Sequence, residues 1–340
     1  MDDATTAPHR PTILLAMMPG LRDYAFTPDQ LARLAAVGEL LADDSVDDFA
    51  APGVADLLAR TEVIVGHWGC PTLTDEVMAA APALQLFAYA AGTVKWQVTD
   101  AVWERDVRVT SAAAANAVPV AEYTVATILL ANKGFFSYAA RERDPQAEVP
   151  LDPTRIGNVG RRIGLVGASH VGRHVIRLLQ PYDLELAVAD PFLDDAEAAR
   201  LGVTRLDLDD LCAWCDLLSI HAPDIESTKG MIGARQLAAL ADGVTVVNTA
   251  RGALIDPVAL TAELATGRLS AVLDVTEPEP LPDDSPLRSL PNVVLTPHIA
   301  GAVGTEMVRL AELAVGEVER YVRGEPAQYP VTRDVIDRIA

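Results

Sequence analysis

Gly164-Leu165-Val166-Gly167-Ala168-Ser169-His170-Val171-Gly172 decides the fold of the second half of this chain, because an apolar strand there turns into an amphipathic helix. The stretch approximates the pattern G-x-G-x-x-G, whose glycines form a tight turn, admit a pyrophosphate and pack helix against strand. Gly167 and Gly172 take the first and third positions, and Ser169 takes the second. Serine is small and its hydroxyl can donate to a phosphate, so the stretch predicts a dinucleotide-binding turn.

An acidic residue at a suitable distance strengthens this prediction. Asp190 ends the next predicted strand, 23 positions after Gly167, and about 20 are expected for the acid that binds the adenosine ribose. A carboxylate there repels a 2′-phosphate, so NAD (NADH) is favoured over NADP. The alternative is that Asp190 merely caps the strand before Pro191.

Composition limits the class of protein. The 340 residues are enough for a large core and two domains. Half are hydrophobic and only 5% are aromatic, and short apolar runs alternate with amphipathic stretches, which favours an α/β fold. The formal net charge is −21, so nucleic acid is not expected as a partner because phosphate binding needs a basic surface. An anionic substrate needs a local cation.

No membrane segment or signal peptide is expected. No apolar stretch approaches the roughly 20 residues that span a bilayer. The N-terminus, Met1-Asp2-Asp3-Ala4-Thr5-Thr6, is acidic and lacks the apolar region of a signal peptide. We therefore expect a cytoplasmic protein. The chain stops at Ala340, soon after its last predicted helix, so no regulatory extension is expected.

The cysteines and histidines do not predict a metal site. Cys212 and Cys215 have the spacing of a redox or metal pair, but a zinc site takes about four ligands and no second pair exists. We interpret both as structural residues of a helix that leads into a strand. His170 and His174 are spaced i, i+4, but no carboxylate motif accompanies them.

Helix and strand signals give two regions of βαβ type. A strand is predicted from Thr12 to Met18, and a helix follows with Thr27 as its N-cap and Pro28 at its first position. A long apolar helix opens at Asn116–Tyr123 and runs to about Ala131.

The charged segment 141–158 contains three prolines and predicts an irregular connection. The second domain then begins at Arg161. A last helix, from about Gly304 to Arg323, returns the chain to the first domain.

Three charged residues follow predicted strands in the last third of the chain. Arg251 follows the apolar run 244–247, Glu279 comes five places after Asp274, and His298 follows the run 293–295. Ligands of open α/β sheets bind at the carboxyl ends of strands, so we expect these side chains to converge. Arginine can bind a carboxylate through two parallel hydrogen bonds, and a histidine beside a carboxylate can exchange protons near neutral pH. Each residue taken singly has an ordinary alternative, as a surface ion pair or a loop residue.

These motifs together resemble the D-isomer-specific 2-hydroxyacid dehydrogenase family. The resemblance covers the chain from about Leu84 to Gly324. The matching stretches, in order, are Asn116–Tyr123, Gly167–Gly172, His221–Pro223, Asn248–Asp256, Asp274–Pro280 and Thr296–Gly301. The resemblance implies an α/β fold of two doubly wound parallel-sheet domains, with a Rossmann cofactor domain inserted in a flavodoxin-like substrate domain. It places the substrate domain at 1–115 and 302–340, and the dinucleotide-binding domain at 116–301.

The resemblance also implies roles for single residues. Arg251 would bind the substrate carboxylate and polarise its C2 oxygen, His298 would be the acid/base, and Glu279 would be its carboxylate partner. Asp274 would accept from the nicotinamide carboxamide. The implied cofactor-binding set is Gly167, Ser169, His170, Val171, Gly172, Asp190, His221, Ala222, Pro223, Thr249, Ala250, Asp274, His298 and Gly301. The implied activity is hydride transfer between NAD(H) and a small anionic D-2-hydroxy acid or 2-keto acid.

One stretch departs from the family pattern. The family's G-x-G-V-D, whose backbone N–H groups hold the substrate carboxylate, is replaced by Ala91-Gly92-Thr93-Val94-Lys95-Trp96. Backbone donors remain, so Ala91, Gly92 and Thr93 are the expected substrate-binding residues. Lys95 and Trp96 either reach toward the substrate or face solvent, and both possibilities stay open.

Other functions and the assembly also stay open. A phosphite-type anion dehydrogenase and an NAD-sensing, corepressor-like binding protein are the alternatives on the same scaffold. Formate is disfavoured because formate dehydrogenases of this group carry glutamine where Glu279 stands. The apolar helix 118–131, with Phe135, Phe136 and Tyr138, carries more hydrophobic surface than one domain face needs. We therefore expect a homodimer, unless this surface packs within the chain.

Overall fold

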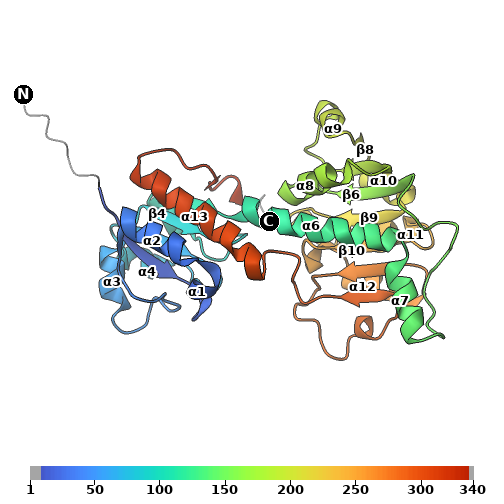
Figure 1. Ribbon diagram of the computed structural model, residues 1–340, viewed down its shortest axis with the longest axis horizontal. Helices are drawn as coiled ribbons and strands as arrows, with labels where there is room; N and C mark the ends of the chain where they lie inside the picture. The colour runs from blue at the N-terminus through green and yellow to red at the C-terminus, as the bar shows by residue number, and fades with distance from the viewer. Residues whose placement is uncertain (1–8, 337–340) are drawn as a thin grey trace, which may run out of the picture. The chain divides into compact units, whose positions relative to one another are not determined.

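The computed structural model describes residues 9–336. The acidic segment 1–6, on which the signal-peptide expectation rests, lies outside the described residues, as does the end of the chain at Ala340. The chain forms two compact units. Of the described residues, one unit contains 9–116 and 302–336, and the other contains 117–301. Each unit has its own sheet and its own covering helices (Figure 1).

The sheet of the first unit is parallel except at one edge. Its strands follow the order β2-β1-β3-β4-β5, and β13 joins β5 in the antiparallel direction. The parallel part has the flavodoxin-like order. The strands are β1 (Thr12–Ala16), β2 (Glu39–Leu40), β3 (Val63–Gly66), β4 (Leu86–Tyr89), β5 (Arg108–Ser111) and β13 (Pro330–Val331). The helices are α1 (Leu21–Ala25), α2 (Pro28–Val37), α3 (Val54–Arg60), α4 (Asp75–Ala80), α5 (Asp100–Glu104), η3 (Gly304–Glu306) and α13 (Met307–Val322).

The helices α2 and α13 test the predicted helix boundaries. The Thr27 side chain accepts from the Gln30 N–H, and the Gln30 side chain accepts from the Thr27 N–H, which forms a capping box. With Pro28 at the first helical position, the predicted start of α2 is confirmed. The last helix differs slightly from its prediction, because its first turn is the 3₁₀ turn η3 and the α-helix begins at Met307. Both helices lie side by side on the sheet of their unit (Figure 1).

The second unit is a seven-stranded parallel sheet in the order β12-β11-β10-β9-β6-β7-β8. Renumbered from its first strand, this is the Rossmann order 3-2-1-4-5-6 with one further strand. The predicted α/β class with two doubly wound sheets is confirmed. The strands are β6 (Arg161–Val166), β7 (Leu184–Ala189), β8 (Thr204–Arg205), β9 (Leu217–Ile220), β10 (Thr245–Asn248), β11 (Ser270–Leu273) and β12 (Val293–Leu295). The helices are α6 (Ala113–Asn132), α7 (Phe135–Arg143), α8 (His170–Leu179), α9 (Asp195–Leu201), α10 (Leu208–Trp214), α11 (Ala234–Ala239), η1 (Gly252–Leu254), α12 (Pro257–Ala265) and η2 (Pro286–Arg288).

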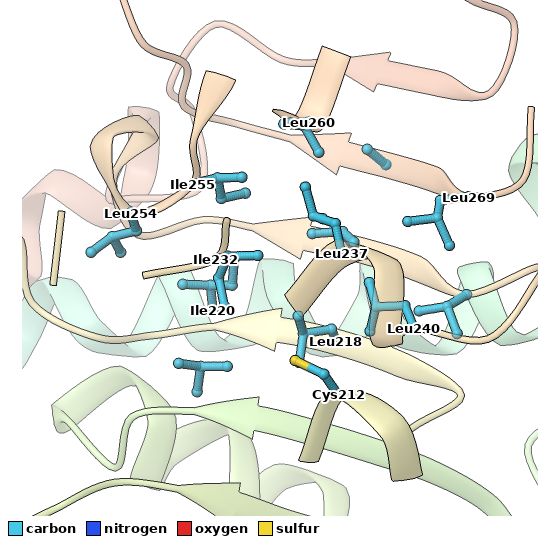
Figure 2. Close-up of a cluster of buried hydrophobic side chains, with 14 of the residues drawn as sticks. Cys212, Leu218, Ile220, Ile232, Leu237, Leu240, Leu254, Ile255, Leu260 and Leu269 are labelled. Atoms are coloured by element: carbon cyan, nitrogen blue, oxygen red, sulfur yellow. The ribbon is translucent and has the colours of Figure 1, made fainter. Parts of the chain in front are cut away.

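One of the two cores of this unit contains the cysteine pair. Figure 2 shows Leu218 of β9 near Leu237 of α11, and Ile220 of β9 near Ile232, within one buried cluster that also contains Leu260 of α12. Cys212 lies in this cluster, and burial raises the pKa of its thiol to about 12. A neutral buried thiol packs as a small apolar group, in agreement with the structural interpretation of the pair.

The helix α6 is longer than the sequence suggested. It has 20 residues, and its length and composition suffice to cross a membrane, so the expectation that no apolar stretch approaches that length is wrong. Core helices of soluble proteins can have the same length and composition. Ala121, Val125 and Ile128 of α6 are buried in the second core of this unit, which favours a core helix. The segment 141–158, predicted to be an irregular connection, has no helix or strand from Asp144 onward, although α7 extends to Arg143.

Candidate active site

The register of the second sheet brings four loops to one edge. Ile220 of β9 and Leu273 of β11 both pair with Asn248 of β10, and Leu273 pairs with Leu295 of β12. These residues end their strands, so the following loops start at the same level. Those loops contain His221, Arg251, Glu279 and His298, and a parallel sheet therefore gathers side chains that lie far apart in the sequence.

Glu279 and His298 form the most direct contact of this edge. Glu279 Oε1 lies 2.7 Å from His298 Nδ1, and both side chains are about half exposed. They line a cavity of about 410 Å³ together with Asp274, Thr276 and Thr296, within the size range of small-molecule sites. A carboxylate on Nδ1 orients the ring and leaves Nε2 as the nitrogen that can exchange a proton with a ligand.

Arg251 belongs to the same cluster of charges. Burial lowers the pKa of its guanidinium, and the carboxylates of Asp224 and Glu279 act in the opposite direction. Arg251 thus lies within electrostatic reach of Glu279, the residue that contacts His298. Asp224 was not among the predicted site residues. Its position directly after the matched His221–Pro223 stretch was the available signal.

The loop that carries Arg251 is folded by Asn248. The Asn248 side-chain amide donates to the Arg251 carbonyl at 2.8 Å, and its Oδ1 accepts from the Ala250 N–H at 3.0 Å. Gly252 then passes against the loop that leads to Glu279. A Cβ at Gly252 would lie 2.1 Å from the carbonyl group of Thr276, so only glycine allows the two loops to approach this closely.

The loop that carries His298 is held by Asp274. The buried Asp274 carboxylate accepts from the Thr296 hydroxyl at 2.6 Å and from the Ile299 and Ala300 N–H groups at 2.8 Å each. These bonds bracket His298, whose φ of 55° is left-handed, a conformation that costs a non-glycine residue about 1 kcal/mol or more. Asp274 therefore holds this loop, in addition to the role toward nicotinamide that the resemblance implies.

The predicted glycine turn has the geometry that a dinucleotide needs. Gly167 has a φ of 97°, and a Cβ there would lie 2.8 Å from the Ala222 nitrogen. A Cβ at Gly172 would lie 2.3 Å from the Gly167 carbonyl oxygen. Ser169 is the N-cap of α8, and its hydroxyl oxygen accepts from the Gly172 N–H. His170 and Val171 follow as the first helical residues, where a helix N-terminus favours an anion.

Asp190 lies beside this turn. Its carboxylate accepts from the Ala168 N–H at 2.7 Å and from the Phe192 N–H at 2.8 Å. The strand order reverses between β6 and β9, and dinucleotides bind at that switch point in Rossmann sheets. The residues present therefore fit a nicotinamide dinucleotide.

The remaining predicted cofactor residues lie along the same edge. His221 is buried, its Nε2 lies 2.9 Å from the Ser219 hydroxyl, and burial lowers its pKa to about 3. Ala222 packs on Gly167 and Pro223 follows it, while Thr249 and Ala250 directly follow β10. Gly301 closes the loop of His298 and is the last residue of its unit.

The predicted substrate-binding stretch lies in the first unit, just after β4. Ala91 is buried, whereas Gly92 and Thr93 are partly exposed. Lys95 is partly buried and Trp96 is 76% exposed, so the Trp96 side chain faces solvent.

No cluster of three His, Cys, Asp or Glu residues suited to a metal occurs within 9–336. The Nδ1 atom of His174 lies 2.9 Å from a guanidinium nitrogen of Arg177, and a cation there opposes metal binding.

Comparisons with known proteins agree with this geometry. Residues 125–300 match the family model described as D-isomer specific 2-hydroxyacid dehydrogenase, NAD binding domain. A D-3-phosphoglycerate dehydrogenase of Archaeoglobus fulgidus is 30% identical over 77% of this chain and 50% of its own length. A glyoxylate reductase of Korarchaeum cryptofilum is 32% identical over 78% of this chain and 82% of its own length. The solved structure of apo D-mandelate dehydrogenase from Rhodotorula graminis has a TM-score of 0.79 and 25% identity, and covers 96% of this chain and 98% of that one.

The chain therefore belongs to the D-isomer specific 2-hydroxyacid dehydrogenase family, and it contains the NAD-binding domain of that family. It spans about half the length of the D-3-phosphoglycerate dehydrogenases that it matches.

The burial of His221 predicts a pH dependence of stability. An unfolded histidine titrates near pH 6.5, whereas the pKa of His221 in the fold is lowered to about 3. Between these values the unfolded chain binds a proton that the folded chain does not. The contribution of neutral His221 is therefore complete above pH 6.5 and is lost as the pH falls toward 3, by about 1.4 kcal/mol per pH unit. In urea titrations between pH 6.5 and 5, a His221→Asn variant should lose that part of the slope, and an unchanged slope would contradict this assignment.

Proposed function

We propose that this protein transfers a hydride between NAD(H) and a D-2-hydroxy acid or its 2-keto acid. The observation that supports the proposal most is the 2.7 Å contact between Glu279 and His298 within electrostatic reach of Arg251. This reaction needs two groups from the protein. One is a cation that binds the substrate carboxylate, and the other is an imidazole, held by a protein carboxylate, that exchanges the hydroxyl proton.

His298 is the proposed acid/base. Its Nδ1 faces Glu279, so its Nε2 takes the proton from the C2 hydroxyl during oxidation and returns it to the C2 oxygen during reduction. Glu279 fixes the ring orientation and stabilises the imidazolium. The bound nicotinamide supplies the hydride acceptor or donor.

Arg251 is the proposed carboxylate ligand. Its planar guanidinium can form two parallel hydrogen bonds to a carboxylate, which a lysine cannot. Burial strengthens such a contact because less water competes for it. Ala91, Gly92 and Thr93 remain the substrate-binding residues that the family resemblance implies.

The proposed substrate stays at the level of a chemical class. The names of the relatives refer to phosphoglycerate, glyoxylate and mandelate, acids that differ in the group on C2. None of the alternatives, a phosphite-type dehydrogenase or a corepressor-like NAD sensor, is favoured by these relatives. A cytoplasmic location and a homodimer are further proposals. The dimer is supported by the half-exposed Phe135 and Tyr138 on α7.

A panel of 2-keto acids tests the activity. Purified protein with NADH should reduce at least one of pyruvate, glyoxylate, hydroxypyruvate or a bulky or branched member, followed by NADH absorbance. Replacement His298→Gln should lower kcat by roughly 100-fold or more, because the proton donor is lost, while NADH still binds by fluorescence titration.

The matched control is His9→Gln, since His9 is an exposed histidine that pairs with Glu62. It should keep the wild-type rate. Tight NADH binding without reduction of any keto acid would favour the corepressor-like alternative, and a His298→Gln enzyme as fast as wild type would remove this histidine from the mechanism.

Asp190 should set the preference between NAD and NADP. Replacement Asp190→Asn keeps an acceptor for the Ala168 N–H but removes the charge that repels a 2′-phosphate. We expect the ratio of NADPH to NADH affinities to rise by about tenfold or more, a change of about 1.4 kcal/mol. Fluorescence titration with both cofactors measures this ratio, and a ratio equal to that of wild type would show that Asp190 does not face the ribose.

A further inference from the structure

Two consecutive residues of α6 contact the two loops that carry the catalytic side chains. The Tyr123 hydroxyl lies 2.9 Å from the Thr296 hydroxyl, two residues before His298. The Thr124 hydroxyl lies 2.8 Å from the Thr249 hydroxyl, two residues before Arg251. One turn of a single helix thus contacts both loops.

The direction of the Tyr123 bond follows from its neighbours. Thr296 has one hydroxyl hydrogen, and its oxygen lies 2.6 Å from the Asp274 carboxylate, which only accepts. The Thr296 hydrogen therefore points to Asp274, so Tyr123 donates to Thr296. Burial, with the nearby charge of Asp274, raises the pKa of Tyr123, which keeps this donor protonated at neutral pH.

The Thr124 bond has the opposite direction. Thr124 uses its single hydrogen on the carbonyl of Val120, one helical turn earlier, at 2.7 Å. Thr249 must therefore donate to the Thr124 oxygen. Both threonines of this pair are buried, so water does not compete for the bond.

These two bonds act on loops that need support. His298 has a left-handed backbone conformation, and the Thr296 hydroxyl supplies one of the three hydrogen bonds by which Asp274 holds its loop. Arg251 is largely buried beside two carboxylates, so a small shift of its loop changes how its guanidinium is presented. An error of about 1 Å in such a group is enough to cost a large part of a rate.

We propose that Tyr123 and Thr124 are positioning residues, which align His298 and Arg251 with each other through hydroxyl bonds from one helix. This inference rests on the proposed function for its kinetic consequences. The geometric part, that each hydroxyl holds one loop, does not depend on it.

The kinetic test uses Tyr123→Phe and Thr124→Val, which remove the hydroxyls and keep the volumes. One buried hydrogen bond contributes about 0.5–1.5 kcal/mol, which corresponds to roughly 2- to 10-fold in a rate or an affinity. Tyr123→Phe should lower kcat by that factor with little change in the KM for the keto acid, because it disturbs the proton donor. Thr124→Val should mainly raise the KM, because it disturbs the carboxylate ligand.

The control is Thr127→Val, a buried threonine of the same helix whose hydroxyl makes no bond to either loop among the described residues. It should match wild type in both constants. A merely structural role would instead lower the melting temperature and the fraction of active protein, and kcat calculated per NADH-binding site would then stay at the wild-type value, as would KM.

Amide hydrogen exchange gives a readout that needs no substrate. Tyr123→Phe should speed exchange at Ile299 and Ala300, which donate to Asp274, and Thr124→Val should speed it at Ala250. Wild-type exchange at these amides in both variants would overturn the inference, as would a kcat and KM that change together. If wild type reduces no keto acid, the proposed function fails, and the exchange data still decide whether the hydroxyls hold the loops.

Discussion

The site depends on a buried carboxylate that is used as a structural anchor. Asp274 accepts three hydrogen bonds from residues on both sides of His298, and a buried carboxylate is stable only when it is bonded in this way. Its bonds offset the cost of the left-handed backbone at His298. Asp274 thereby holds the backbone of the residue whose imidazole contacts Glu279.

A second constraint is the close approach of neighbouring loops at one sheet edge. The strand β6 and the strands β9 to β12 end in register, so the loops that follow them lie close together. Two glycines allow this close approach of the loops: Gly167 lies against Ala222, and Gly252 lies against Thr276. The first contact shapes the turn for a dinucleotide, and the second lets the Arg251 loop lie against the loop that leads to Glu279. Backbone packing thus links the cofactor residues to the catalytic residues.

Much of this arrangement was predictable from the sequence because its signals are local. The glycine turn, the Thr27 cap and the strand ends before Arg251 and His298 each depend on neighbouring residues, and the family motifs added the roles. The partners that were missed depend on contacts across long separations. Tyr123 and Thr296 are 173 positions apart, and the effect of Asp224 on Arg251 appears only once the loops are placed. The left-handed conformation of His298 and the 3₁₀ turn before α13 had no local signal either.

Glu279 and His298 are proposed to work as a unit, and the rate of keto-acid reduction by a Glu279→Gln variant tests this. Glutamine keeps the size of the side chain and can still bond to the ring, but it removes the charge. We expect kcat to fall by roughly 10-fold or more, whereas the affinity for NADH should stay at the wild-type value. A variant that reduces the keto acid as fast as wild type would show that the charge of Glu279 is not used.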